Sequence, residues 1–345
     1  MSLSFYVAPF LTSFLVSTSL LFLFREISAY LSRARGHWSI DYRRFGGVAV
    51  ILSFLCAVLF RSPLVVTPVI LGIVTGSIAI LFFGIWDDIV TLSWKMQLTF
   101  QISLGVALFA FGLRIFSLPV PFVGQVFVDT LPGSEILGFV VLVLWVVFVM
   151  NALNWVDGVD GLLPSVSLLA FFALFALSLS PQVNQPPLGI LSIALAGAVF
   201  GLLLFNIPPS RFLSGTTGSL FIGFSLSSIA VLSGAKMATC ILVLSLPMLD
   251  ALWVFLERLR SGRSPFHGGD ARHLHYRLRE RGWSDRSLVV GYTIYTGVVG
   301  IIALSFGAIG KTVAFLVLSV LLGIFLLRME RDTKVRVDHS TSHGI

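Results

Sequence analysis

Cysteine is scarce in this sequence, which contains only Cys56 and Cys240. Both lie within apolar runs, so they indicate neither a disulfide framework nor a cysteine metal site. Charged residues are scarce as well, at 11% of the chain against 57% for hydrophobic residues. A water-soluble core of this size would not need so much apolar sequence, which indicates an integral membrane protein.

The apolar residues occur in blocks long enough to cross a bilayer as helices, which satisfy their own backbone hydrogen bonds. Charges, Pro and Gly divide them into eleven expected spans, at about 5–24, 46–60, 64–83, 97–116, 136–150, 162–180, 188–206, 217–234, 237–256, 288–306 and 312–327. The first block lacks a basic start and a small-residue cleavage site, so we interpret it as a retained helix. The prediction is an all-α polytopic membrane protein with about eleven transmembrane helices, forming a single domain over residues 1–345.

Basic residues are distributed unevenly between the two sets of loops. With the N-terminus outside, 19 of the 23 Lys and Arg fall in one set of loops together with a tail at 328–345. The positive-inside rule therefore predicts that these loops and the C-terminus are cytoplasmic. The net charge of +7 does not indicate nucleic acid, because the basic residues do not cluster on a soluble domain. Fourteen of the sixteen acidic residues lie on the same side, which suggests a use for carboxylates there.

Two adjacent carboxylates, Asp87 and Asp88, follow the third expected span. A single acidic residue there would most simply mark the end of the helix. Two of them repel each other and are unfavourable at a helix C-terminus, whose dipole favours cations. We therefore expect a cation partner, either Lys95 or a metal ion.

A second polar stretch, NALNWVDGVDGL at 151–162, follows the fifth expected span. Its oxygen-bearing side chains recur every three residues and would form one ridge in helical or 3₁₀ geometry. They are Asn151, Asn154, Asp157 and Asp160. Gly158 and Gly161 would allow a ligand to approach the backbone. The alternative, a turn made by Asp-Gly pairs alone, does not explain four such residues in phase.

Two further cytoplasmic segments have compositions suited to phosphate. The turn within FNIPPSRFLSGTTGSLFIGF at 205–224 would offer the N–H groups of Gly215, Gly218 and Ser219 at a helix start, although Gly-Ser turns between spans are common. The basic loop at 257–287 contains eight arginines and three histidines. Most of these arginines suit anionic lipid, whereas the HLHY sequence within it suits a diphosphate.

These segments together indicate phosphate chemistry. Carboxylates suit Mg²⁺, which bridges diphosphate oxygens and offsets their charge. The basic loop and the glycine-rich turn suit a polyanionic, water-soluble substrate, and the apolar mass indicates that the other substrate is a lipid.

The same segments resemble those of the polyprenyl-phosphate N-acetylhexosamine-1-phosphate transferases in order and approximate spacing. Six stretches between about residues 40 and 290 carry the resemblance: RRFGGVAV, GIWDD, NALNWVDGVDGL, GTTGSLFIGF, PMLDALWVF and SPFHGGDARHLHYRL. HLHY is similar to the His-x-His-His signature of the N-acetylglucosamine-1-phosphate branch, which initiates O-antigen of lipopolysaccharide, teichoic acid or other envelope glycans. Eleven spans also agree with that branch, since the muramoyl-pentapeptide branch is usually described with ten.

The resemblance implies a reaction. HexNAc-1-phosphate would pass from a UDP-HexNAc, by default UDP-GlcNAc, to undecaprenyl phosphate, giving undecaprenyl-diphospho-HexNAc and UMP. The implied cofactor is Mg²⁺, with Mn²⁺ as an alternative, and the implied location is the bacterial inner membrane with the active site on its cytoplasmic face. Expected partners are these two substrates, membrane lipids and a second copy in a homodimer, and no nucleic acid.

The resemblance also implies roles for individual positions. Asp87 and Asp88 match paired aspartates associated with the lipid phosphate, and Asn154 is expected as a metal ligand. The other residues expected to bind substrate are Lys95, Asn151, Asp157, Asp160, Asn206, Arg272, His273 and His275.

Thr216 is the main departure from the family pattern. Counted without gaps from Asn206, it occupies the position of the family's metal-binding aspartate. A Thr hydroxyl is neutral and is a weaker Mg²⁺ ligand than a carboxylate. A second hypothesis therefore stays open: a catalytically impaired relative or variant that binds UDP-sugar or the lipid carrier. Two smaller departures are Gln97, where a second basic residue often follows Lys95, and Tyr276, which replaces the last His of the signature.

Overall fold

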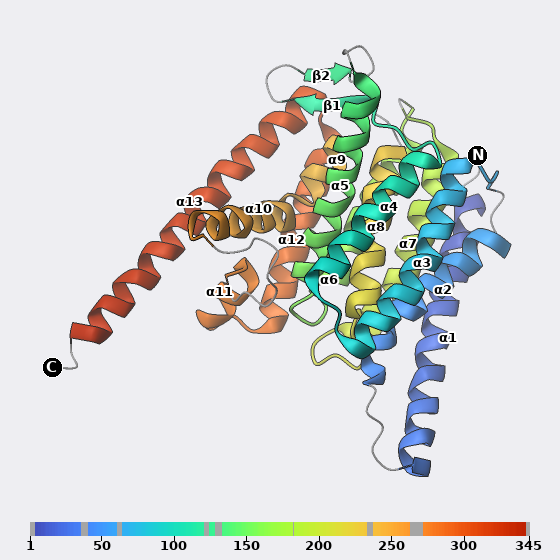
Figure 1. Ribbon diagram of the computed structural model, residues 1–345, viewed down its shortest axis with the longest axis horizontal. Coiled ribbons are helices and arrows are strands. Elements are labelled where there is room, and N and C mark those ends of the chain that lie inside the picture. The colour runs from blue at the N-terminus through green and yellow to red at the C-terminus, as the bar shows by residue number, and fades with distance from the viewer. Residues whose placement is uncertain are drawn as a thin grey trace.

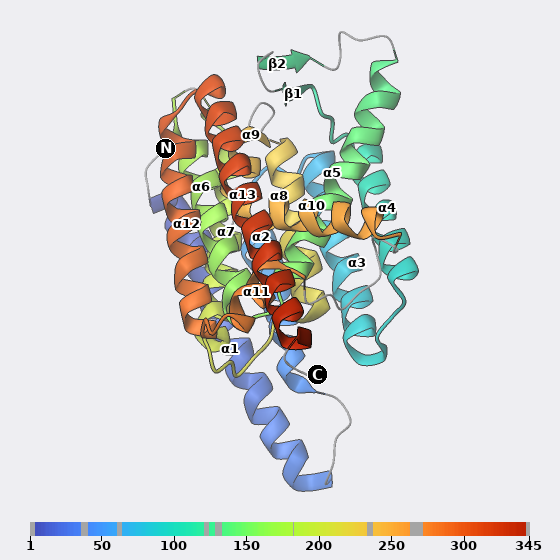
Figure 2. The same ribbon diagram turned by 90° about the vertical axis from the view of Figure 1, so that its left-hand side faces the viewer.

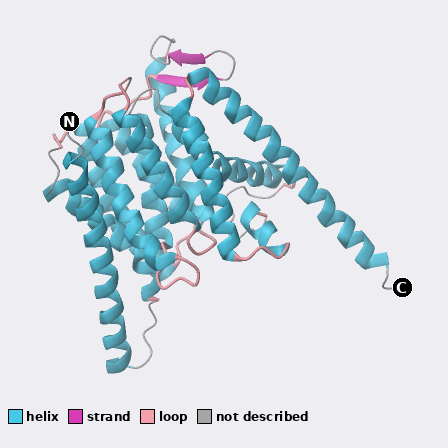
Figure 3. Cartoon of the chain, turned by 180° about the vertical axis from the view of Figure 1, so that it is seen from behind, coloured by secondary structure: helices cyan, strands magenta, loops and turns pink. Residues whose placement is uncertain are grey.

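The computed structural model describes residues 4–35, 41–60, 64–120, 124–127, 133–181, 183–232, 237–262 and 272–342. Helices account for most of these residues, and one two-stranded hairpin is the only sheet among them (Figures 1 and 3). The predicted all-α fold is confirmed.

The helices and strands follow one another as a bundle with short connections. The first half contains α1 (Ser4–Arg35), the 3₁₀ helix η1 (Tyr42–Phe45), α2 (Gly46–Phe60), α3 (Pro68–Val90), α4 (Trp94–Ala110), β1 (Ser117–Val120), β2 (Gly124–Phe127) and α5 (Ser134–Val156). The second half contains α6 (Leu162–Leu179), α7 (Pro186–Asn206), α8 (Gly215–Leu232), α9 (Met237–Val243), α10 (Ser245–Arg260), α11 (Leu274–Glu280), α12 (Asp285–Ser305) and α13 (Ala308–Ser342).

Each of the eleven expected spans contains a helix, but some, such as 64–83 and 97–116, are helical over only part of their described length, and not every one is a full crossing. Nine helices of the described chain are long and apolar enough to cross a membrane, or ten if α9 and α10 count as one span. Helix α4 has only 17 residues, near the lower limit for a crossing. Several boundaries also differ from expectation: α1 continues to Arg35, α3 continues through Asp88 to Val90, α4 already ends at Ala110, and α13 continues through the expected tail to Ser342.

The ninth expected span is broken. Helices α9 and α10 meet at an angle of 77°, and α10 lies across the bundle rather than along it (Figures 1 and 2). Pro247 lies in the first turn of α10, where its missing N–H is tolerated. In one continuous helix its ring would clash with the carbonyl group of Val243. Helix α10 is also too polar to cross lipid alone, because its last turns contain Glu257, Arg258 and Arg260.

The buried centre of the bundle is formed by α7 and α8. In the most apolar segment of each, 83% of the residues are buried. Polar contacts attach neighbours to them: Trp145 Nε1 of α5 donates to Ser227 O of α8 at 3.0 Å, and Ser17 Oγ of α1 donates to Ala198 O of α7 at 3.0 Å. By contrast, α13 exposes large apolar side chains such as Ile309 along its length. Such an apolar exterior indicates lipid contact, so the chain is a multi-pass membrane protein.

The two ends of the bundle differ in character. One end bears the hairpin, in which Ser117 pairs with Phe127, and α1 begins at this end (Figure 1). The opposite end gathers the C-terminal ends of α3, α5 and α7 and the start of α8. The polar stretches singled out in the sequence meet at that second end.

Candidate active site

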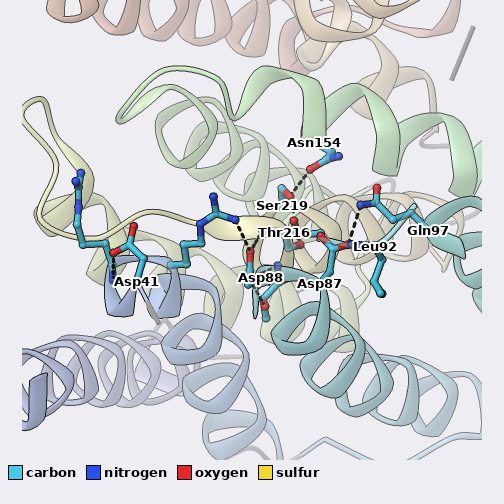
Figure 4. A network of polar contacts seen from close by, with 11 residues as sticks. Asp41, Asp87, Asp88, Leu92, Gln97, Asn154, Thr216 and Ser219 are labelled. Atoms are coloured by element: carbon cyan, nitrogen blue, oxygen red, sulfur yellow. Dashed lines mark hydrogen bonds and ion pairs between the residues drawn. The ribbon is translucent and has the colours of Figure 1, made fainter. Parts of the chain in front are cut away.

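The last turn of α3 lies against the first turn of α8. Gly84 allows this approach, because a Cβ atom there would lie 2.5 Å from the Cα atom of Thr217. Asp88 lies one turn further along the same face of α3. Its carboxylate accepts hydrogen bonds from Thr216 N at 2.8 Å, Thr217 N at 3.1 Å and Thr217 Oγ1 at 2.7 Å (Figure 4). Asp88 therefore caps α8, where the helix dipole favours an anion.

This cap changes the role expected for the glycine-rich turn. The first free N–H groups of α8 donate to Asp88, and Gly218 N donates to Ser214 O at 3.0 Å. The phosphate cradle expected at the start of this helix is therefore occupied by a side chain of the protein.

Asp87 points away from Asp88 (Figure 4). Its Oδ1 accepts hydrogen bonds from Leu92 N and from Gln97 Nε2, both at 2.9 Å, and its side chain is buried. These contacts hold the connection between α3 and α4. The structure thus separates the two aspartates expected to act together, and it gives Gln97 a polar partner in place of a phosphate.

The 151–162 stretch contributes three side chains to the same end of the bundle. Asn154 is in the last turn of α5, Asp157 follows directly after that helix, and Asp160 lies in the turn before α6. Asn154 Oδ1 accepts from Ser219 Oγ at 2.7 Å, and Asp160 Oδ2 accepts from Ser210 N at 3.0 Å. These bonds fix the stretch to α8 and to the loop before it.

Asn206, at the end of α7, joins the two loops. Its Oδ1 accepts from Gly161 N at 2.7 Å, and its Nδ2 donates to Phe212 O at 2.6 Å. The side chain is buried, so both of its polar ends are used inside the protein. Asn206 therefore shapes the site chiefly by holding its walls together.

These residues surround a cavity of about 360 Å³. Its polar lining comes from η1, α3, α5, α7, α8 and the turn between α5 and α6, and consists of Arg44, Asp88, Asn154, Asp157, Asp160, Asn206 and Thr216. Six of these seven were singled out from the sequence. The exception is Arg44, which lies in the RRFGGVAV motif.

Among the described residues that line the cavity are three carboxyl groups, those of Asp88, Asp157 and Asp160. Burial raises the pKa of Asp157 well above its usual value, and the nearby charges of Asp88 and Asp160 raise this pKa further. A cation in the cavity would relieve this repulsion. Among the described residues, no three acidic, His or Cys side chains lie close enough to hold a metal without other ligands. Mg²⁺ typically uses one or two carboxylates plus substrate phosphates, so the oxygen donors present fit it.

The described residues at 272–277 of the basic loop are held by α10 and are not among the residues that line the cavity. His273 Nδ1 lies 2.9 Å from Asp250 Oδ2, and Leu274 N donates to Asp250 Oδ1 at 2.8 Å. Arg272 Nη1 lies 3.5 Å from Glu257 Oε1, and Arg277 Nη2 donates to Glu257 Oε2 at 2.8 Å. The charges expected to face a diphosphate are thus partly neutralised by α10.

His275 and Tyr276 lie against Gly158, which lines the cavity. The side chain of His275 is fully buried, and neither ring nitrogen has a hydrogen-bond partner among the described residues. Burial lowers the pKa of His275 to about 4, so the ring is neutral near pH 7. A Cβ atom on Gly158 would lie 2.7 Å from His275 Nε2 and 2.4 Å from Tyr276 Oη. The HLHY segment therefore packs directly on the cavity wall.

Replacing Gly158 by Ala is expected to displace α11, because the new methyl group has no room beside His275 and Tyr276. We expect a lower melting temperature and weaker UDP binding, measured by thermal unfolding and calorimetry in detergent. Gly300→Ala is the matched control, since a Cβ atom there meets nothing within 4 Å and a helical Gly→Ala change is usually favourable. Equal melting temperatures in the two variants would contradict the close packing.

Besides the loop residues, two further expected substrate residues do not line the cavity. Asn151 Nδ2 donates to Gln101 Oε1 at 2.5 Å, which links α5 to α4. Lys95 is exposed in the first turn of α4, with its Nζ 5.8 Å from the centre of the Trp94 ring. The i, i+3 spacing placed Asn151 on one ridge with Asn154, but it could not predict that α4 covers Asn151.

Comparison with known proteins agrees with the motif pattern. The profile of glycosyl transferase family 4 matches residues 70–234. A probable undecaprenyl-phosphate N-acetylglucosaminyl 1-phosphate transferase of Bacillus subtilis is 30% identical over 260 residues, covering 73% of this chain and 70% of the relative.

Other relatives match over shorter segments. A decaprenyl-phosphate N-acetylglucosaminephosphotransferase of Mycobacterium tuberculosis is 32% identical over 33% of this chain and 32% of its own length. A phospho-N-acetylmuramoyl-pentapeptide-transferase of Gluconobacter oxydans is 31% identical over 37% and 35%, respectively. The length and identity of the Bacillus match, together with the profile, establish that the chain belongs to glycosyl transferase family 4.

Proposed function

We propose that this protein transfers HexNAc-1-phosphate from a UDP-HexNAc, with UDP-GlcNAc as the default, to undecaprenyl phosphate. The products are undecaprenyl-diphospho-HexNAc and UMP, in the first membrane step of a cell-envelope glycan. The observation that carries the proposal is the cavity where Asp88, Asp157 and Asp160 converge at one end of an apolar bundle. The names of the Bacillus and Mycobacterium relatives support the same class of reaction.

The proposed reaction joins two phosphates. An oxygen of the lipid phosphate forms a bond to the β-phosphorus of the UDP-sugar, and the bond from that phosphorus to the bridging oxygen breaks as UMP leaves. Asp88 and Asp157, with oxygens of Asn154 and Thr216, would hold Mg²⁺ or Mn²⁺, which would offset charge on the diphosphate. The protein's own part is positioning, as expected for phosphoryl transfer.

The test is release of UMP by the purified protein. We expect release from UDP-GlcNAc only when undecaprenyl phosphate and Mg²⁺ are both present. Release that does not need the lipid would refute the assignment. A panel of UDP-sugars in the same assay identifies the HexNAc.

The impaired-relative hypothesis is favoured by Thr216, which lines the cavity where the family pattern has a carboxylate. It predicts binding of UDP-sugar or lipid carrier without turnover. Binding by calorimetry with no UMP release, even at high enzyme concentration and with Mg²⁺ or Mn²⁺, would favour it over the enzyme.

We also propose that the cavity faces the cytoplasm in the bacterial inner membrane. Single cysteines at Glu280 and Glu135 would test this in a chain lacking Cys56 and Cys240. Both glutamates are exposed. Glu280 is the last residue of α11, at the cavity end of the bundle, and Glu135 lies in the first turn of α5, at the hairpin end. In intact cells we expect an impermeant maleimide to label Glu135→Cys only. Labelling of Glu280→Cys and not of Glu135→Cys would mean that the cavity faces the outside of the cell.

A further inference from the structure

Arg44 differs in charge from the rest of the cavity. Among the described residues that line the cavity, it is the only Lys or Arg, and it faces three carboxylates. It comes from η1, which is separated in sequence from every other lining residue. No step of the proposed reaction uses Arg44.

The backbone at Arg44 is fixed to the loop that precedes α8. Leu213 N donates to Arg43 O at 2.6 Å, and Gly47 N donates to Ser214 O at 3.0 Å. Arg43 Nη2 adds a bond of 3.2 Å to Ser210 Oγ. The start of the Arg44 side chain is therefore held at a constant position relative to the cavity.

The guanidinium group of Arg44 is little used within the protein. Its Nη1 lies 4.0 Å from Asp88 Oδ1, the outer limit of an ion pair, and it makes no side-chain hydrogen bond among the described residues. Asp88 already accepts three hydrogen bonds from α8, so it does not require Arg44 as a donor. The Arg44 side chain is 44% exposed, against 3% for that of Asp88.

We propose that the Arg44 guanidinium binds a phosphate group of a substrate in this cavity. A phosphate brought near Asp88, Asp157 and Asp160 would be repelled unless cations offset both charges. Arg44 supplies a permanent cation, and its planar group can donate two parallel hydrogen bonds to phosphate oxygens. The inference rests on the proposed function, and the phosphate belongs either to the UDP-sugar or to the lipid.

The first experiment compares ligands with and without phosphate. The affinities of uridine, UMP and UDP for the full chain in detergent with Mg²⁺ are measured by calorimetry for the unmodified protein and Arg44→Gln. We expect Arg44→Gln to weaken UDP binding roughly 10-fold or more and to leave uridine unchanged, since a charged hydrogen bond is lost. The UDP affinity of Arg44→Lys should lie between those of the unmodified protein and Arg44→Gln, because Lys keeps the positive charge but cannot donate two parallel hydrogen bonds from a planar group.

A matched control is Arg211→Gln, which removes an exposed charge from the same end of the bundle but not from the cavity lining. It should leave every affinity unchanged. Melting temperatures of all variants show whether each is folded. Because the Arg44 side chain is half-exposed, we expect Arg44→Gln to unfold near the temperature of the unmodified chain.

The second experiment compares undecaprenyl phosphate with undecaprenol in the same variants. Weaker binding of undecaprenyl phosphate alone assigns Arg44 to the lipid phosphate, and weaker binding of UDP alone assigns it to the nucleotide. Unchanged affinities of Arg44→Gln for both phosphate ligands would overturn the inference while leaving the proposed function intact. If the unmodified chain bound neither UDP nor undecaprenyl phosphate, both proposals would fall.

Discussion

Replacing Thr216 by Asp is expected to raise the rate of UMP release by about 100-fold, the scale of losing one well-placed electrostatic group in an enzyme. Thr216 lines the cavity, and its backbone N–H is held by Asp88, so a carboxylate at this position would join those of Asp88, Asp157 and Asp160. Mg²⁺ prefers such anionic oxygens to a neutral hydroxyl. The measurement is UMP release against Mg²⁺ concentration, and half-activation should occur at lower Mg²⁺ in the variant.

The controls separate charge from shape. Thr216→Asn has nearly the shape of Asp without its charge, and it should release UMP no faster than the unmodified chain. Adding Asp88→Asn to Thr216→Asp should abolish the gain. Thermal unfolding gives a second readout, since a fourth carboxylate should destabilise the metal-free protein and increase its stabilisation by Mg²⁺. If the unmodified chain releases UMP as fast as Thr216→Asp at the same Mg²⁺ concentration, residues other than position 216 suffice to hold the metal.

Much of the fold can be predicted from the sequence because a bilayer allows few solutions. Blocks of apolar residues must become helices in lipid, and each expected span contains a helix. The break between α9 and α10 is harder to foresee, although Pro247 and the charges at 257–260 mark it. A hydropathy pattern gives length and polarity, whereas the angle between two helices depends on what packs beside them.

The composition of the cavity was also largely predictable, but the direction of each side chain was not. Motif spacing brought together Asp88, Asp157 and Asp160, since each lies where a span ends at the same face. It also grouped Asn151 and His273 with them, yet these contact Gln101 and Asp250, respectively. Such partners lie on other helices, 50 and 23 residues away, and no local pattern identifies them.

The pair Asp87 and Asp88 shows why neighbours in sequence can differ in role. Adjacent residues on an α-helix point about 100° apart, so only one of the two can face a given neighbour. The contact of Gly84 with Thr217 turns Asp88 toward α8 and the cavity. Asp87 is thereby turned toward the start of α4, where Leu92 and Gln97 surround its carboxylate.

Because of this difference, we expect substitution of Asp88 to affect activity and substitution of Asp87 to affect stability. Both are made in the Thr216→Asp background if the unmodified chain is too slow to assay. Asp88→Asn should lower UMP release by about 100-fold or more, because it removes a charge from the cavity. Asp87→Ala should instead lower the free energy of unfolding by about 1–3 kcal/mol, because Leu92 N–H and Gln97 lose their acceptor. The folded fraction of Asp87→Ala should retain most of its activity.

Asp87→Asn keeps an acceptor oxygen and should be more stable than Asp87→Ala. A well-folded Asp87→Asn protein as inactive as Asp88→Asn would mean that both carboxylates act on substrate, which the orientation of Asp87 argues against.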